Sequence, residues 1–252
     1  MDTDEGLYGW GSCYTTGDLV KSSLKDLSPL IIGESPLEPE RVTEKLHQET
    51  FWYGRGGVLT TFISGVNIAL WDIYGKATGQ SVSRLLGGRF RERIKPYASQ
   101  IFSWPVDEMV ERLRSAKARG FRAFKLGWRP FGRLDARTDE ALVKAAREAI
   151  GDECDLMVDA GGSDAFWHND LKWAINAANM LKQYNVVWFE EALTDGDIEG
   201  FKMLRQASPV WIATGECLRK RQTFYPWILQ RAVDVLQPDQ TTCGGISEGR
   251  RI

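Results

Sequence analysis

Residues 186–191 read Val-Val-Trp-Phe-Glu-Glu, a short apolar run that ends in two acids. Three further runs end in an acid in the same way, namely 157–159 (Met-Val-Asp), 213–216 (Ala-Thr-Gly-Glu) and 236–239 (Leu-Gln-Pro-Asp). The acids are separated by 31, 26 and 23 residues, which is about the length of one strand followed by one helix. We therefore expect the carboxylates to stand at the ends of successive buried strands.

The chain from about residue 94 alternates between apolar runs and helical patterns. The runs, rich in β-branched and aromatic residues, are 94–101, 121–128, 155–160, 186–190, 210–215 and 233–237. The helical patterns are 106–119, 139–150, 171–184, 198–206 and 222–231. Buried strands that alternate with amphipathic helices predict an α/β fold with parallel strands, as either a doubly wound sheet or a (β/α) barrel.

The first part of the chain has a different pattern. A strand-like piece at 7–14 is followed by a loop rich in Ser, Pro and Glu at 28–39, then by helical patterns at 40–49 and 58–78. Gly87-Gly88 marks a break after these helices. We predict a mostly helical companion domain over residues 1–92 and an α/β domain over residues 93–252.

Composition excludes several classes of protein. The chain has 252 residues and a formal net charge of −2, so it lacks the basic excess that nucleic-acid and anionic-membrane binding require. Its beginning has no signal-peptide pattern, and no run of 18 apolar residues occurs, so we expect a cytoplasmic protein. The four cysteines form no C-x-x-C pair, and neither common phosphate-binding glycine motif is present.

Carboxylates gathered at one end of a parallel sheet repel one another. At ~4 Å and an effective dielectric constant near 20, each pair of like charges costs about 4 kcal/mol. Such a cluster takes up protons or holds a divalent cation, and oxygen donors without Cys or His favour Mg²⁺. We predict Asp159, Glu190 and Glu216 as metal ligands; the alternative is that these acids cap the helices that follow. Lys125, at the end of the second run, would face the same place and could bind a substrate carboxylate.

Taken together, these motifs resemble the mandelate racemase and muconate-lactonising branch of the enolase superfamily. The resemblance rests on the opening 3–11 (Thr-Asp-Glu-Gly-Leu-Tyr-Gly-Trp-Gly), the helix 68–76 (Ile-Ala-Leu-Trp-Asp-Ile-Tyr-Gly-Lys), Leu85-Leu86-Gly87-Gly88 and the four acidic strand ends. It covers essentially the whole chain. It implies an incomplete (β/α) barrel of about six strands with a partial, mostly helical N-terminal capping domain.

The resemblance also implies an activity. It implies a Mg²⁺ enzyme that removes the proton α to a carboxylate, with Asp159, Glu190 and Glu216 as the metal ligands. Lys125 matches the first lysine of the family's K-x-K pair, and Asp239 matches the acid that orients a histidine base. Gly127 stands where the second lysine belongs. Because a two-base racemase needs that lysine, an acid-sugar dehydratase is favoured over a racemase or cycloisomerase.

A second departure concerns the histidine base, which belongs about one unit past Asp239 and has no counterpart before Ile252. We therefore expect the chain to be truncated at both ends relative to the family, and the alternative to an enzyme is an inactive fragment with a binding or structural role. The base is left open. His168, Trp128 and Tyr53 are candidate substrate contacts, with plain packing as the alternative for each.

The partners implied by the resemblance are a small-molecule carboxylate and, in the full-length form, further copies of the same chain. The sequence leaves open which acid sugar is bound.

Overall fold

A computed structural model describes residues 1–164 and 167–252. The chain forms two compact units, each described here by itself. The first contains residues 1–92, 215–226 and 238–252, and the second contains residues 93–214 and 227–237. The break after Glu92 coincides with the predicted domain boundary, but two later stretches group with the first unit. The division into 1–92 and 93–252 stays a prediction.

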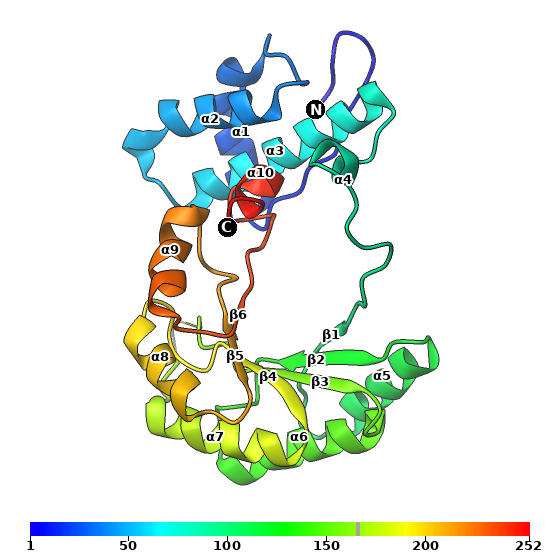
Figure 1. Cartoon of the computed structure of the whole chain (residues 1–252), viewed down its shortest axis with the longest axis vertical. Helices are drawn as coiled ribbons and strands as arrows, with labels where there is room; N and C mark the ends of the chain where they lie inside the picture. Colours follow the sequence, from blue (N-terminus) through cyan, green and yellow to red (C-terminus); the bar gives the residue numbers. More distant parts are fainter. Residues whose placement is uncertain (165–166) are drawn as a thin grey trace. The chain divides into compact units, whose positions relative to one another are not determined.

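The second unit contains a single parallel sheet whose six strands are adjacent in chain order (Figure 1). The strands are β1 (Ala98–Ile101), β2 (Ala123–Gly127), β3 (Asp155–Asp159), β4 (Val186–Glu190), β5 (Trp211–Thr214) and β6 (Val235–Leu236). Each lies within a run predicted from the sequence. A doubly wound sheet would reverse its strand order, whereas a barrel keeps it sequential. The sheet is therefore part of a barrel-type arrangement, with β1 and β6 at its edges.

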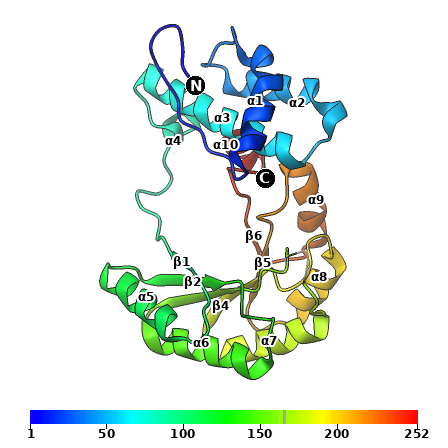
Figure 2. The ribbon, with the colours of Figure 1, turned by 180° about the vertical axis from the view of Figure 1, so that it is seen from behind.

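Helices follow the strands of this unit and lie on the outer side of the sheet (Figures 1 and 2). They are α5 (Asp107–Ala118), α6 (Ala136–Ile150), α7 (Leu171–Gln183) and α8 (Ile198–Ala207). The side chains of Asp135, Asp170 and Asp197 cap α6, α7 and α8 by accepting backbone N–H groups of the first turn. The caps are thus acids other than those at the strand ends.

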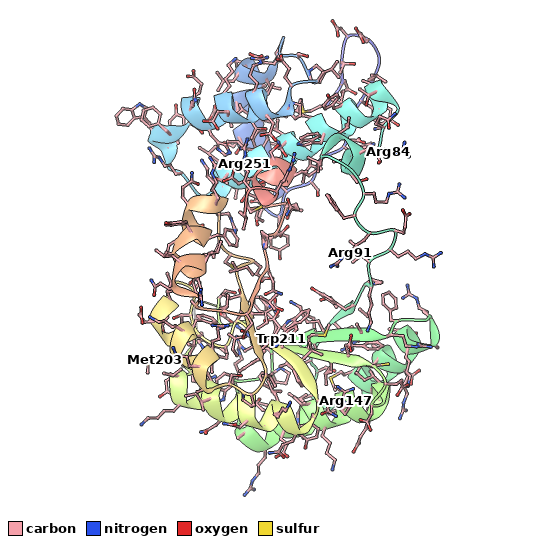
Figure 3. The ribbon with its side chains drawn as sticks, in the orientation of Figure 1. Arg84, Arg91, Arg147, Met203, Trp211 and Arg251 are labelled. Atoms are coloured by element: carbon pink, nitrogen blue, oxygen red, sulfur yellow. The ribbon has the colours of Figure 1, made fainter. Side chains whose placement is uncertain are left out.

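Arg147 holds together the segments that lead into β3 and β4 (Figure 3). This buried guanidinium on α6 donates to the carbonyl oxygens of Cys154 (2.7 Å), Gly151 (2.8 Å), Tyr184 (2.9 Å) and Asn185 (3.1 Å). Each of these carbonyls lies just before a strand. The arginine therefore satisfies backbone acceptors that would otherwise be buried without a donor.

Helices make up most of the first unit. They are α1 (Gly17–Ile31), α2 (Pro39–Glu49), the short 3₁₀ helix η1 (Phe51–Tyr53), α3 (Gly57–Thr78), α4 (Val82–Leu85) and α10 (Gly245–Gly249). Another helix, α9 (Lys220–Gln230), belongs to this unit up to Pro226. The predicted strand at 7–14 is wrong, because Tyr8 makes only an isolated bridge with Asp2. The predicted loop at 28–39 is wrong at its start, because α1 continues through Pro29 to Ile31.

The core of the first unit forms around α3. Buried side chains of α1, α2 and α3 pack together, namely Leu27, Val42, Leu46, Phe62, Ile63, Val66 and Leu70. By length and composition alone α3 would also suit a membrane span, but 61% of its most apolar window is buried inside the protein. A core helix passes the same test, so this feature does not argue for a membrane.

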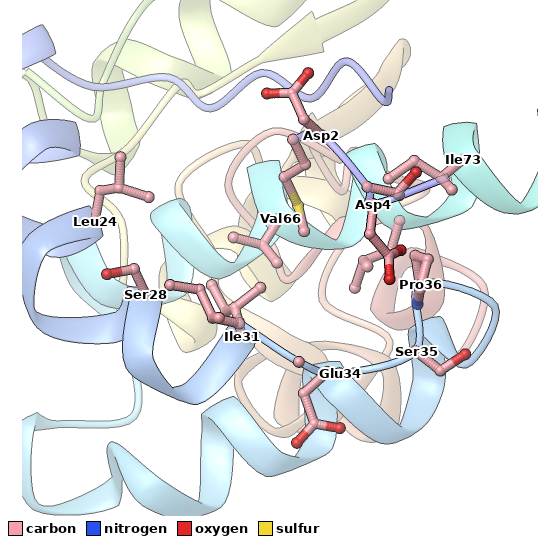
Figure 4. A pocket seen from close by; sticks show the side chains of 15 residues that line it. Asp2, Asp4, Leu24, Ser28, Ile31, Glu34, Ser35, Pro36, Val66 and Ile73 are labelled. Atoms are coloured by element: carbon pink, nitrogen blue, oxygen red, sulfur yellow. The ribbon is translucent and has the colours of Figure 1, made fainter. Parts of the chain in front are cut away.

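A cavity of about 650 Å³ lies in the first unit between the N-terminal stretch, α1 and α3 (Figure 4). Leu24, Ile31, Val66 and Ile73 supply apolar side chains to its wall, and Glu34 lies at the turn that follows α1. None of the site residues predicted from the sequence lines this cavity.

Candidate active site

The carboxyl ends of β2, β3 and β4 place three residues side by side. Gly127 pairs with Asp159, and Asp159 pairs with Glu190 in the parallel register. Neighbouring strands lie about 4.8 Å apart, and paired residues point to the same face of the sheet. The two predicted metal ligands in this unit are therefore brought together, with a glycine beside them.

Lys125 lies between the two carboxylates. Its Nζ is 2.9 Å from Oδ2 of Asp159 and 2.6 Å from Oε1 of Glu190. The lysine side chain is 10% exposed, and those of Asp159 and Glu190 are 2% and 0% exposed. Lys125 is two residues before Gly127 on the same face of β2, so its ammonium reaches the level of the paired acids. The predicted convergence of this lysine with two of the three acids is present.

The other carboxylate oxygens also accept hydrogen bonds. The N–H of Gly161 donates to Oδ1 of Asp159 at 2.8 Å. Oε2 of Glu190 accepts from the indole Nε1 of Trp188 at 3.0 Å and from Nε2 of Gln237 at 2.8 Å. Trp188 and Gln237 were not among the residues predicted for the site. Both lie within predicted runs, Trp188 two residues before Glu190 and Gln237 at the end of the sixth run, but the pattern of the runs does not pair either of them with Glu190.

The pKa values of Asp159 and Lys125 depend on how deeply the two side chains are buried and on the charged groups next to them. Burial, and then the nearby Glu190 carboxylate, raise the pKa of Asp159 to about 7 despite the opposing effect of Lys125. Burial alone would lower the pKa of Lys125, but Asp159 and Glu190 outweigh it and raise that pKa. The ammonium is therefore held in its charged form. One cation against two carboxylates leaves the cluster short of positive charge when both acids ionise.

Gly127 has no space for a side chain. A Cβ at this position would lie 2.8 Å from Cβ of Asp159 and 3.1 Å from its carboxyl carbon. The next residue, Trp128, has a φ of 66°, and its N–H donates to the carbonyl of Asp159 at 2.9 Å. A Cβ on Gly161 would lie 2.9 Å from the Trp128 ring, so the indole covers the turn after β3. Trp128 is 36% exposed, as a side chain at the rim of a site would be.

Arg133, which was not among the predicted site residues, joins the loops that follow β2 and β3. Its guanidinium donates to the carbonyls of Ala160 and Gly161, the latter at 3.0 Å. It also lies over the Trp167 ring at 4.6 Å and 3.5 Å from Asp164. Arg133 therefore binds carbonyl oxygens of the turn after β3. The Gly161 N–H of the same turn donates to Asp159.

Of the other predicted residues besides Trp128, His168 lies in the second unit and the rest lie in the first. Glu216 comes two residues after β5 and belongs to the first unit, as do Tyr53 in η1 and Asp239. Oδ1 of Asp239 accepts the N–H of Thr241 at 2.7 Å and its hydroxyl at 2.8 Å. His168 is exposed, with its ring centroid 6.4 Å from that of Trp167. The ligand role of Glu216 and the roles of Asp239, His168 and Tyr53 stay predictions.

Comparison with known proteins decides the family. Residues 1–87 match the model of the mandelate racemase / muconate lactonizing enzyme N-terminal domain, and residues 108–252 match the model described as enolase C-terminal domain-like. This chain belongs to the mandelate racemase and muconate lactonizing enzyme family. The resemblance inferred from the strand-end acids is confirmed, and so is the barrel-type α/β fold that it implied.

Several members of this family are similar over the whole chain. It is 32% identical to a D-galactarolactone cycloisomerase of Agrobacterium fabrum, over 100% of this chain and 65% of the relative. It is 32% identical to an L-talarate/galactarate dehydratase of Salmonella typhimurium, over 96% of this chain and 60% of the relative. The chain thus spans less than two thirds of the length of both.

A solved structure is also similar to the whole of this chain. The 3,6-anhydro-D-galactonate cycloisomerase of Zobellia galactanivorans superposes with a TM-score of 0.92 at 33% identity, covering 100% of this chain and 68% of that one. Of these three similar proteins, two are named cycloisomerases and one is named a dehydratase.

Proposed function

We propose that this family member carries part of the active site of a Mg²⁺-dependent enzyme that removes the proton α to the carboxylate of an acid sugar. The observation that supports this most is the Lys125 ammonium held between the buried carboxylates of Asp159 and Glu190. A structural salt bridge would need only one acid. Two acids and one lysine at the carboxyl ends of parallel strands form the kind of charged cluster on which barrel enzymes build their chemistry.

The residues present fit a magnesium ion. Asp159 and Glu190 supply hard oxygen donors, and a carboxylate oxygen that already accepts one hydrogen bond keeps a further lone pair. The cluster also has more negative than positive charge when both acids are ionised, which a cation would correct. Glu216 is the proposed third ligand. When bound, Mg²⁺ would supply positive charge against the negative charge that develops on the substrate carboxylate.

Lys125 has the role of a fixed cation in this proposal. Its raised pKa keeps the ammonium protonated, so it serves to bind and stabilise a substrate carboxylate instead of removing a proton. Trp128, at the rim of the same strand end, would exclude water from one side of the bound acid sugar. Gly127 removes the second lysine of the family's pair, so we propose single-base chemistry, which suits dehydration.

A cycloisomerase is the second candidate. Two relatives bear that name, one acting on a galactarolactone and one on a 3,6-anhydrogalactonate, and both match the whole of this chain. Both reactions concern galactose-derived acids, as do those of the named galactarate and galactonate dehydratases. We therefore propose a galactose-derived acid as the substrate class, in the cytoplasm and in a multimer of the full-length form.

Proton exchange tests the proposal directly. The chain and its full-length form are each incubated in D₂O with Mg²⁺ and galactarate, galactonate or galactarolactone, and ¹H NMR follows the signal of the α-proton. We expect the full-length form to lose that signal; D159N and E190Q should prevent the loss, and the surface variant K172M should not. A dehydrated keto acid identifies a dehydratase, and a rearranged ring identifies a cycloisomerase. Mg²⁺ binding without exchange on any of these acids would favour an inactive fragment.

A further inference from the structure

Glu190 is held in place by an amide and an indole that approach the same oxygen. Nε2 of Gln237 and Nε1 of Trp188 lie 2.8 Å and 3.0 Å from Oε2. A carboxylate with two donors on one oxygen cannot turn about its last bond without breaking both hydrogen bonds. Its other oxygen, Oε1, consequently remains directed at Lys125.

The Gln237 side chain has a fixed orientation in this arrangement. An ionised carboxylate accepts and does not donate, so the amide nitrogen must face Glu190. The backbone is fixed as well, because the N–H of Gln237 donates to the carbonyl of Thr214 on β5 at 3.1 Å. The amide is therefore presented to Glu190 from a neighbouring segment, independently of the strand that carries the acid.

Stability alone does not account for a glutamine at position 237. Within the described part of the chain, its Oε1 is buried and accepts no hydrogen bond. A buried acceptor without a donor costs free energy that an apolar side chain of the same size would avoid. A polar side chain whose presence has a cost to stability is typical of a functional site.

From these contacts we propose that Gln237 is a positioning residue, which together with Trp188 fixes Glu190 so that Oε1 serves Lys125 and a bound cation. The effect of Gln237 on a bound cation rests on the proposed function. Its effect on the contact between Glu190 and Lys125 does not. Groups that orient metal ligands in this way commonly change metal affinity by 10–100-fold when they are removed.

The experiment compares Q237L, which keeps the size of the side chain but removes its donor, with W188F, which keeps an aromatic ring but removes the indole N–H. Q237M is a second variant at the same position in case Q237L folds poorly, and Q183L, at an exposed glutamine of the same unit, is the matched control. Mn²⁺ affinity is measured by calorimetry, and the Lys125 ammonium is followed by its ¹H–¹⁵N NMR signal.

We expect Q237L and W188F each to bind Mn²⁺ about tenfold or more weakly, with Q183L unchanged. Because both donors act on one oxygen, the double variant should lose less than the product of the two single losses. Parent-like Mn²⁺ affinity in Q237L would overturn the proposal.

Failure of the proposed function is distinguishable from failure of this inference. If the parent protein binds no Mn²⁺, the proposed metal enzyme is wrong, and the Lys125 signal then decides the positioning role alone. Broadening or loss of that signal in Q237L and Q237M, with retention in Q183L, supports the role. An unchanged signal in both variants refutes it.

Discussion

Asp139 is a buried acid in the first turn of α6, and only 3% of it is exposed. Its Oδ1 accepts the N–H of Gly132 at 2.7 Å. Burial nevertheless raises its pKa from the ordinary 3.8 to about 6. The folded protein therefore binds this proton more tightly than the unfolded chain does. It follows that the ionised acid opposes folding at neutral pH and that this cost disappears as the pH falls through 6 towards 4.

Replacing Asp139 with asparagine should remove this pH dependence while keeping an oxygen that accepts from Gly132. Between pH 7 and pH 4, the free energy of unfolding of the parent protein should rise by about 1–3 kcal/mol relative to that of D139N. Urea titrations at several pH values measure the difference. E148Q, at an exposed acid of the same helix, should show no such change, and a constant difference between parent and D139N would contradict the prediction.

At the scale of single residues, the sequence predicted which acids converge better than it predicted which side chains donate hydrogen bonds to them. Asp159, Glu190 and Lys125 could be found because each follows a short apolar run, and strand ends of one polarity meet at one edge of the sheet. Trp188 and Gln237 could not be assigned to Glu190, because the pattern of apolar residues carries no information about which side-chain donor reaches which oxygen. The roles of Tyr53, in η1, and of His168, in the loop before α7, stay predictions, because no apolar periodicity around them indicates which way their side chains face.

The end of β2 shows how one element is adapted to its neighbour. Gly127 is flanked by Asp159 on β3, and a methyl group at 127 would approach that side chain more closely than van der Waals contact permits. The glycine thus leaves Lys125 an open path to both acids. Any larger residue would have to displace β3 or turn Asp159 away from the lysine.

G127A should therefore destabilise the protein by about 1–3 kcal/mol, the usual cost of overpacking a filled site. Alanine would otherwise be favoured over glycine in a strand, so the sign of the effect reports the clash. Urea unfolding measures it. G17A serves as the control, because a Cβ at Gly17 meets no atom within 4 Å and α1 begins there. Stability at or above that of the parent protein in G127A would show that β3 yields without cost.

Helices and strands could be predicted from the sequence where the intrinsic preference of their residues agrees with their packing in the fold. Strands β1 to β6 each fall within a predicted run, and the signal is clearest for β2 and β3, which are buried along almost their whole length and must therefore be apolar on both faces. Helix α1 (Gly17–Ile31) was not predicted, and its last turn was assigned to a loop because Ser28 and Pro29 favour a loop locally. The burial of Leu27 against α2 and α3 outweighs that preference, and a contact of this kind lies outside any local window.

At the scale of the whole molecule, the first unit is closed by residues far apart in the sequence. The Ser247 hydroxyl accepts from Nδ2 of Asn67 at 2.7 Å and from Nε1 of Trp71 at 2.9 Å. The N–H of Gly244 donates to the hydroxyl of Ser64 at 2.9 Å. These buried hydrogen bonds attach the 238–252 stretch to α3. The sequence could not reveal this grouping, because partners about 180 residues apart leave no periodic trace.

S247A should leave the Asn67 amide and the Trp71 indole without their shared acceptor. Each is buried, so we expect a loss of about 1–3 kcal/mol in the free energy of unfolding. Urea unfolding gives the loss, and limited proteolysis should show earlier cleavage within residues 238–252. S22A, at an exposed serine of α1, should change neither. Unaltered stability and cleavage in S247A would mean that water replaces the hydroxyl without cost.

The attachment of residues 244–247 to α3 also sets an order of events during translation. Ser64, Asn67 and Trp71 leave the ribosome long before their partners exist, whereas β1 to β5 are already complete by residue 214. At about 5–20 residues per second, α3 waits on the order of ten seconds for Ser247. In the nascent chain the side chains of Ser64, Asn67 and Trp71 therefore lack these partners until residues 244–247 have been made.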